Sequence, residues 1–458
     1  MGLPMTLATC VGEMFAGANL ALSLAPLLTQ GQIEALETHA DAALKAVYLP
    51  RLVAGDWTGT MNLTEPQAGS DVGAVRTKAE PRGDGSFAVT GEKIFISWGD
   101  HDIAENICHL VLARLPNGEP GTKGISLFLV PKFLPDEQGR PGVANTVRAV
   151  SLEHKMGLHG SPTCVMAFDA AQGWLVGAEH RGMAAMFTMM NNARLGVGIE
   201  GLSQAEAALQ AATAFARERR QGTTPSGETG IAGHADVRRM LATMAATVAT
   251  ARAICLDCAF STDMAGATGD PIWAARAAFL TPIAKAFATD AGCEVSETAM
   301  QVFGGMGYVE ETGVAQYYRD VRVTAIYEGT NGIQAMDLVG RKLADGGAAA
   351  QALIDEVAAT AAGGGATGAA LAEAGQRLRT ATDWMVMAAR DDRTAGAAAY
   401  LRAFALVLGG HYLAKAAAAD ASRTALAVFQ AAHLLPEAGG LCAAATAGSA
   451  LLYADGLV

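Results

Sequence analysis

The stretch Ser86-Phe-Ala-Val-Thr-Gly-Glu-Lys-Ile-Phe-Ile-Ser97 alternates apolar and polar residues over most of its length, which is typical of a half-buried β-strand. Gly91 in its middle predicts a turn. Short apolar runs separated by Gly, Pro and Asp clusters follow it at residues 106–115, 123–131 and 162–168. Because short turns can join only antiparallel neighbours, residues 56–180 are predicted to form a compact antiparallel β domain.

On both sides of this domain the pattern becomes helical. Residues 1–55 are predicted to form helices, with an apolar run broken at Pro26. Residues 181–343 hold long segments with apolar residues at helical spacing, and such lengths predict an antiparallel bundle. Glycines around a short helical stretch predict a linker at 344–366, and alanine-rich sequence predicts a helical extension at 367–458. The expected fold class is therefore α+β multidomain, with partial N-terminal helices, a central antiparallel β domain, a C-terminal antiparallel helical bundle and an extra C-terminal helical extension.

Composition narrows the classes of function. The 458 residues carry a formal net charge of -12, which argues against nucleic acid or an anionic membrane as the main partner. The seven cysteines have no regular spacing and predict free thiols in a reducing, cytoplasmic compartment. Cys255 and Cys258 have the C-x-x-C spacing of a redox or metal pair, but they lie in a helical pattern and are interpreted as buried structural thiols. We expect no membrane span and no metal site.

Three stretches indicate the chemistry: Met61-Asn-Leu-Thr-Glu-Pro-Gln-Ala-Gly-Ser-Asp71, Gln301-Val-Phe-Gly-Gly-Met-Gly-Tyr308 and Tyr318-Arg-Asp-Val-Arg-Val-Thr-Ala-Ile-Tyr-Glu-Gly-Thr330. In this order, with a β domain between helical ones, they resemble the acyl-CoA dehydrogenase family. Residues 151–166 and the C-terminal extension resemble a longer subfamily that includes 3-methylmercaptopropionyl-CoA dehydrogenases. The resemblance implies FAD-dependent dehydrogenation of an acyl-CoA thioester to the 2-enoyl-CoA, with electron-transfer flavoprotein as the electron acceptor.

Glu328 matches the residue that removes the substrate's α-proton in this family. That proton is only weakly acidic, so the reaction needs a carboxylate and stabilisation of the developing enolate. Ile326 and Tyr327 offer an apolar wall that would raise the pKa of Glu328 towards neutrality. The alternative interpretation is an ordinary turn residue before a helix that Thr330 or Asn331 caps.

The resemblance also implies the binding residues. Those expected to contact FAD are Met61, Leu63, Thr64, Gly69, Ser70, Phe95, Ile96, Ser97, Arg219, Gln221, Gln301, Gly304, Gly305 and Thr330. Those expected to contact the substrate are Ser70, Arg194, Tyr327 and Gly329. Five of the FAD residues match positions that in this family reach the FAD of a neighbouring subunit: Arg219, Gln221, Gln301, Gly304 and Gly305. A homodimer or homotetramer with FAD at the subunit interface is therefore implied.

Several alternatives stay open at this point. Residues 95–97 could form a routine edge strand, residues 217–220 a solvated basic helix end, and Arg194 a helix-terminal salt bridge. The match to the family begins late, so most of its N-terminal helical domain is expected to be missing. Two other functions remain: an acyl-CoA oxidase that uses oxygen, and a truncated, non-catalytic flavoprotein or assembly subunit.

Overall fold

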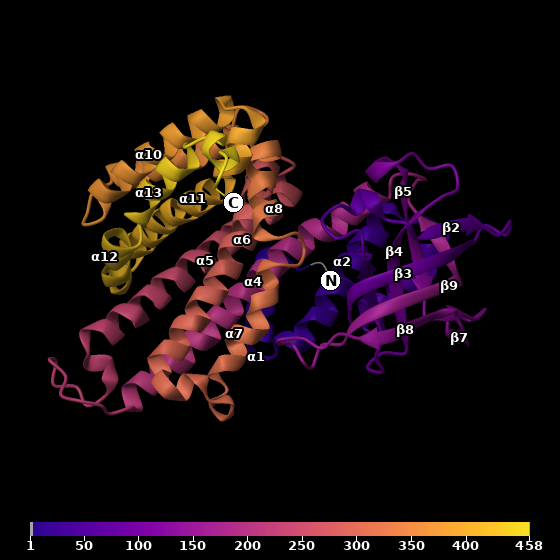
Figure 1. Ribbon diagram of the computed structural model, residues 1–458, viewed down its shortest axis with the longest axis horizontal. Helices are drawn as coiled ribbons and strands as arrows, with labels where there is room; N and C mark the ends of the chain where they lie inside the picture. Colours follow the sequence, from indigo (N-terminus) through magenta and orange to yellow (C-terminus); the bar gives the residue numbers. More distant parts are fainter. Residues whose placement is uncertain (1–2, 458) are drawn as a thin grey trace. The chain divides into compact units, whose positions relative to one another are not determined.

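The structure is a computed structural model that describes residues 3–457, without the side chains of residues 191 and 192. Within that part the chain forms two compact units. Residues 19–193 form the β unit, and residues 3–18 together with 194–457 form the helical unit. Figure 1 shows the strands of the first unit and the long helices of the second.

The β unit begins with the helices α2 (Leu20–His39) and α3 (Ala42–Ala54) and continues as a sheet. Its strands are β1 (Trp57–Asn62), β2 (Lys78–Pro81), β3 (Phe87–Ser97), β4 (Asn106–Arg114), β5 (Ile125–Pro131), β8 (Val147–Leu152) and β9 (Thr163–Val176). The short strands β6 (Phe133–Pro135) and β7 (Pro141–Ala144) form a separate two-stranded sheet. Strand pairing runs β1-β4-β2-β3-β9-β5, and β5 also pairs with β4. Strands β4, β2, β3, β9 and β5 therefore close into a ring, which leaves few free edges.

The sheet is mostly antiparallel, as predicted, but β1 and β4 pair in parallel. The predicted turn at Gly91 is wrong, because β3 runs through it from Phe87 to Ser97. A Cβ atom at Gly91 would lie 2.4 Å from Oγ1 of Thr77, so glycine permits a close approach of two strands there. The register shifts between Val89 and Gly91, which is the mark of a bulge.

The predicted break at Pro26 is also wrong. Pro26 lies inside α2, which begins after Asn19, where the side chain of Asn19 accepts a hydrogen bond from the N–H of Leu22. A proline removes one helical hydrogen bond, but the residues around it, including Leu24 and Leu28, are buried. Tertiary packing of the apolar face therefore keeps the helix continuous.

The helical unit contains α1 (Met5–Ala18) and a set of long helices. These are α4 (Gly182–Glu218, of which residues 194–218 belong to this unit), α5 (Ala235–Thr268) and α6 (Pro271–Phe303), followed by the short α7 (Val314–Val321) and α8 (Asn331–Asp337). Helices α4 and α6 come close at Gly201, where a Cβ atom would lie 2.5 Å from the carbonyl oxygen of Ala288. This close approach places the residues of α4 around Glu200 next to those of α6 around Lys285.

Residues 344–366, predicted as a linker, contain α9 (Ala348–Ala362). Its residues Leu353, Ile354 and Val357 are buried in the same core as the bundle, so this segment is a packed part of the helical unit. The extension continues with α10 (Gly368–Met387), α11 (Arg390–Ala419), α12 (Thr424–His433) and α13 (Glu437–Ala445).

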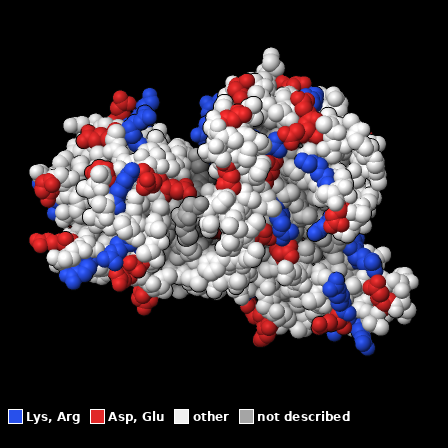
Figure 2. All heavy atoms as spheres, turned by 180° about the vertical axis from the view of Figure 1, so that it is seen from behind, with Lys and Arg blue, Asp and Glu red and all other residues white. Residues whose placement is uncertain are grey.

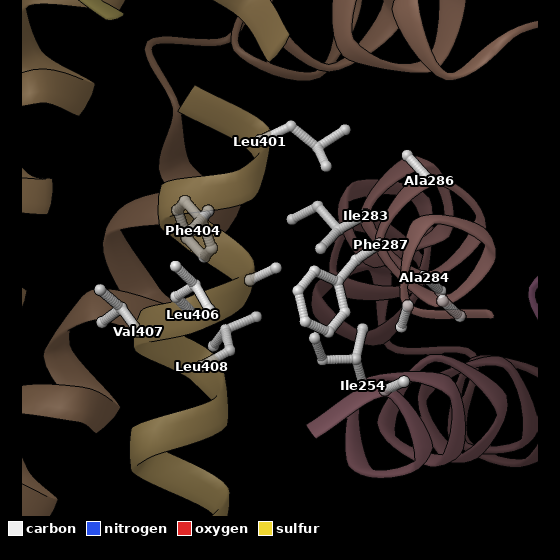
Figure 3. Packing of buried hydrophobic residues seen from close by; sticks show 14 of the residues in the cluster. Ile254, Ile283, Ala284, Ala286, Phe287, Leu401, Phe404, Leu406, Val407 and Leu408 are labelled. Carbon is white, nitrogen blue, oxygen red and sulfur yellow. The ribbon is translucent and has the colours of Figure 1, made fainter. Parts of the chain in front are cut away.

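One hydrophobic core joins the bundle and the extension. Figure 3 shows Phe404 and Leu408 of α11 beside Ile283 and Phe287 of α6 and Ile254 of α5. Helices α5 and α11 are long and apolar enough to span a membrane by length and composition, but half of the most apolar window of α5 and 72% of that of α11 are buried. Both are therefore core helices. Figure 2 shows acidic and basic side chains interspersed over the visible surface.

Candidate active site

Glu328 lies in a strained turn of the helical unit, between a 3-10 segment that ends at Ala325 and helix α8. Its backbone φ is 54°, in the left-handed region that a non-glycine residue rarely adopts, and Gly329 follows with φ of 78°. Such strain persists only where the surroundings hold it, and it is concentrated at functional sites.

Lys285 of α6 stabilises this turn through hydrogen bonds. Its Nζ donates hydrogen bonds to the carbonyl oxygen of Gly329 at 2.9 Å and to Oδ1 of Asn331 at 2.8 Å. Nδ2 of Asn331 donates in turn to Oδ1 of Asp290 at 2.7 Å. The side chain of Gln334 donates to the carbonyl oxygen of Glu328 at 3.1 Å. The carbonyl oxygens of Glu328 and Gly329 are thus both held by side chains.

One oxygen of the Glu328 carboxyl group is shielded from water. This oxygen, Oε2, is buried and has no hydrogen-bond partner among the described residues. Burial raises the pKa of Glu328 to about 7, against the opposing attraction of Arg194 and Lys285. Ile326 is 51% exposed and does not form the expected apolar wall, so the rise has another origin than the one predicted from the sequence.

Thr330 caps α8, as the alternative interpretation of this turn proposed. Its hydroxyl accepts a hydrogen bond from the N–H of Ile333 at 3.3 Å. The threonine is exposed and lines an open cavity of about 500 Å³ together with Gly332, Tyr318 and Arg322. Capping therefore leaves the outer side of Thr330 accessible.

A second carboxyl group, not considered from the sequence, belongs to the same site. Glu200 of α4 is buried, and its Oε2 accepts a hydrogen bond from the hydroxyl of Tyr327. Burial raises the pKa of Glu200 to about 8, with a smaller contribution from the negative charge of Glu328. The sequence offered only a weak signal, an acidic residue in the otherwise apolar segment Gly196-Val-Gly-Ile-Glu-Gly201.

Lys285 was missed as well, and it is fully buried. Burial lowers its pKa to about 8, against the attraction of Glu328, Asp290 and Glu200. A lone lysine in the apolar segment Phe279-Leu-Thr-Pro-Ile-Ala-Lys-Ala-Phe287 was the available signal, because lysine is rarely buried without a partner.

Arg194 forms a salt bridge, as one of its two interpretations expected, but not at a helix end. It lies inside α4 instead of at a helix end, and it is only 5% exposed. Its guanidinium forms an ion pair of 3.2 Å with Asp337, so it is not open to solvent for a nucleotide. It acts on Glu328 as a positive charge that lowers the pKa of that carboxyl group.

In the β unit, the end of β1 and the loop after it carry the first group of predicted flavin residues. Met61, Leu63 and Thr64 are half-buried, while Gly69 and Ser70 are exposed. The loop is anchored by Glu65, whose carboxylate accepts hydrogen bonds from the N–H groups of residues 76 and 77 and forms a buried 2.8 Å ion pair with Lys93. Burial opposes the charge of Glu65, but Lys93 and these hydrogen bonds lower its pKa to about 2.

Phe95, Ile96 and Ser97 lie at the end of β3, where the register shifts between Lys93 and Ile96. Phe95 has φ of 60° and its side chain is 60% exposed, while Ile96 is buried. A routine edge strand would not need this bulge, which turns one aromatic side chain out of the sheet.

The remaining predicted cofactor residues lie at the surface of the helical unit. Arg219 and Gln221 follow the end of α4, and Gln301, Gly304 and Gly305 lie at the end of α6; all are exposed. Gly304 has φ 60° and ψ -140°, a conformation open essentially only to glycine. Arg219 forms no ion pair with another described residue.

Comparison with known proteins places this geometry in a family. Residues 60–171 match "Acyl-CoA dehydrogenase, middle domain", residues 180–344 match "Acyl-CoA dehydrogenase, C-terminal domain", and residues 353–454 match "Acetyl-CoA dehydrogenase C-terminal like". The chain is 46% identical to the 3-methylmercaptopropionyl-CoA dehydrogenase of Ruegeria pomeroyi over 83% of its own length and 66% of that protein's.

Two further relatives agree. An acyl-CoA dehydrogenase of Bacillus subtilis is 34% identical over 64% of this chain and 70% of its own length. The solved structure of butyryl-CoA dehydrogenase from Megasphaera elsdenii has a TM-score of 0.65 and 28% identity, covering 75% of this chain and 83% of that one. The chain spans between half and two thirds of the length of the curated relatives that it matches at 38% identity or more. It belongs to the acyl-CoA dehydrogenase family.

Proposed function

We propose that this chain dehydrogenates an acyl-CoA thioester to the 2-enoyl-CoA, with Glu328 as the base that removes the α-proton. The observation that carries the proposal is the state of Glu328, which is held in a strained turn with one carboxyl oxygen buried and unpartnered among the described residues. A pKa of about 7 suits a general base at neutral pH, because it is ionised often enough to act and basic enough to take a proton.

The turn also supplies a donor for the developing negative charge. The backbone N–H of Glu328 donates to no described residue, whereas those of Ile326 and Tyr327 both donate to the carbonyl oxygen of Val323. A free N–H beside the base is suited to hold the thioester oxygen as it becomes an enolate. Gly329 next to it has no side chain to block the approach of the thioester.

The cofactor of this family is FAD, and the exposed residues fit it. Arg219 offers a guanidinium that no described residue pairs with, which suits a pyrophosphate, and Gly304 and Gly305 leave open space where side chains would stand. In the β unit, Thr64, Ser70 and Ser97 offer hydroxyl groups, and Phe95 offers an exposed ring for a flat partner. FAD, when bound, accepts the β-hydrogen as hydride.

We propose two groups of residues as the contacts to FAD. The first group, on the β unit, is Met61, Leu63, Thr64, Gly69, Ser70, Phe95, Ile96 and Ser97, and the second, on the helical unit, is Arg219, Gln221, Gln301, Gly304, Gly305 and Thr330. We propose that the second group includes contacts to the FAD of a neighbouring subunit, in a homodimer or homotetramer. Ser70, Tyr327 and Gly329 remain the proposed substrate contacts, and Arg194 becomes a charge partner of the base.

For the substrate we propose 3-methylmercaptopropionyl-CoA, on the strength of the 46% identity to an enzyme of that name. Electron-transfer flavoprotein is the proposed electron acceptor and the cytoplasm the proposed location. The competing proposals are an oxidase that passes the electrons to oxygen and a flavoprotein without catalytic activity. The buried, near-neutral carboxyl group of Glu328 favours an active enzyme over the last of these.

The test is an anaerobic titration of the FAD-loaded protein with a panel of acyl-CoAs that includes 3-methylmercaptopropionyl-CoA. We expect the flavin absorbance to bleach, and repeating the titration in air distinguishes a dehydrogenase from an oxidase. Glu328→Gln should keep FAD and lose bleaching. Glu311→Gln, which changes an exposed glutamate on the same unit, serves as the matched control. Bound FAD that no thioester bleaches would refute the proposed activity.

A further inference from the structure

Glu200 is a buried acid that the proposed reaction does not use directly. It is 2% exposed, and its two carboxyl oxygens have different surroundings. Oε2 accepts the hydrogen bond of the Tyr327 hydroxyl, and Oε1 is buried without a partner among the described residues. A carboxylate with an unpartnered buried oxygen is costly, whereas a protonated carboxyl group in that place is much less so.

The positively charged groups near Glu200 are already paired with other residues, so they do not neutralise a second negative charge beside Glu328. Helix α6 presents Lys285 to Glu200, while Asp290 of α6 and Arg194 of α4 act on Lys285. Arg194 forms an ion pair with Asp337, and Lys285 donates a hydrogen bond to the carbonyl oxygen of Gly329, next to Glu328. Helix α1 approaches α4 at Gln204 through the carbonyl oxygen of Ala16, which carries no charge.

One of the two glutamates is therefore expected to be neutral. Burial raises the pKa of Glu200 to about 8 and that of Glu328 to about 7, so the proton resides on Glu200 when Glu328 ionises. Because the two groups interact, the measured ionisations belong to the pair.

We propose that Glu200 is a positioning residue for the base: it is protonated at neutral pH and, through the Tyr327 hydroxyl, fixes the residue next to Glu328 without adding a negative charge to the site. The link to catalysis rests on the proposed function; the protonation of Glu200 does not. A neutral acceptor orients Tyr327 as well as a carboxylate would, and it does not repel an enolate that forms at the base.

Two variants test this inference in the FAD-loaded protein. Glu200→Gln keeps the size of the side chain and an oxygen that can accept from Tyr327, but it cannot titrate. Tyr327→Phe removes the hydrogen bond that lowers the pKa of Glu200. The first readout needs no substrate: infrared spectra between pH 6 and pH 9 should contain the C=O stretch of a buried protonated carboxyl group. The part of this band that is lost near pH 8 should be absent in Glu200→Gln and should persist to higher pH in Tyr327→Phe, whereas the part that is lost near pH 7 belongs to Glu328 and should remain in Glu200→Gln.

The second readout is the pH profile of flavin bleaching. The wild type should show two ionisations, near pH 7 and near pH 8, and Glu200→Gln should lose the upper one. An unchanged infrared band and an unchanged profile in Glu200→Gln would overturn the inference. If none of the acyl-CoAs bleaches the flavin of the wild type, the proposed function fails. The infrared experiment still decides whether Glu200 holds the proton.

Discussion

Glu328→Gln is expected to abolish flavin bleaching and, at alkaline pH, to make the protein more stable. The ionised carboxylate of Glu328 is unfavourable in its buried position, as its raised pKa shows. The folded protein therefore holds this proton more tightly than the unfolded chain does, so the stability of the wild type falls as the pH rises through the ordinary pKa towards about 7. Glutamine has no proton to lose and avoids this penalty.

The size of the effect follows from the pKa. A rise from the ordinary value of 4.5 to about 7 corresponds to about 3 kcal/mol, at about 1.4 kcal/mol for each pH unit. Glu328 is half-buried as a whole residue, so this figure is the upper limit. The penalty is fully developed above pH 7 and is absent below pH 4.5, where both states are protonated.

The assay is thermal unfolding of the FAD-loaded wild type and Glu328→Gln at pH 8.5 and at pH 4.5. At pH 8.5 the variant should unfold several degrees higher, and at pH 4.5 the two should coincide. Glu311→Gln, the exposed control, should follow the wild type at both. A variant that is less stable than the wild type at pH 8.5 would refute the assignment of Glu328 as a strained, buried base.

Three further predictions concern the residues around the site. Lys285→Met should cut the bleaching rate at pH 7 by about fivefold, because it removes a positive charge that lowers the pKa of Glu328, and a rise of one unit from about 7 lowers the ionised fraction from about half to about a tenth. A stopped-flow pH profile that keeps the acid limb of the wild type would contradict this. Glu65→Gln should lower the free energy of unfolding by about 3 kcal/mol in urea, since it leaves a buried lysine without its partner; a loss below about 1 kcal/mol would show that the pair contributes little. Arg219→Ala should weaken FAD binding by about tenfold to a hundredfold, the value of a charge-assisted hydrogen bond or two, in a fluorescence titration where Arg217→Ala binds like the wild type; equal affinities for both variants would remove Arg219 from the cofactor site.

The sequence predicted the fold class because its signals are local. Alternation from Ser86 to Ser97 marks a strand, and helical spacing from 235 to 261 marks a helix that the structure extends to Thr268. The turn predicted at Gly91 and the helix break predicted at Pro26 were wrong for the same reason. Each residue is usually a breaker, but at both positions packing against distant residues decides the conformation.

The base could be predicted because it lies in a contiguous motif, whereas its surroundings could not. Glu200 and Lys285 precede Glu328 by 128 and 43 positions and meet it only because the glycines of α4 let that helix approach α6 closely. Burial of Arg194 against Asp337 likewise depends on residues far apart in the chain. A residue-by-residue match to a motif gives no information on such charge partners, which decide when the base is ionised.

The shared core of α6 and α11 has a practical consequence for anyone who cuts or recombines this chain. A fragment ending at Leu343 would leave Ile283 and Phe287 facing water, so it should aggregate instead of behaving as a free-standing catalytic module. In chimaeras made from two relatives, the extension and the faces of α5 and α6 beneath it have to come from the same parent, because they interlock as one set of side chains.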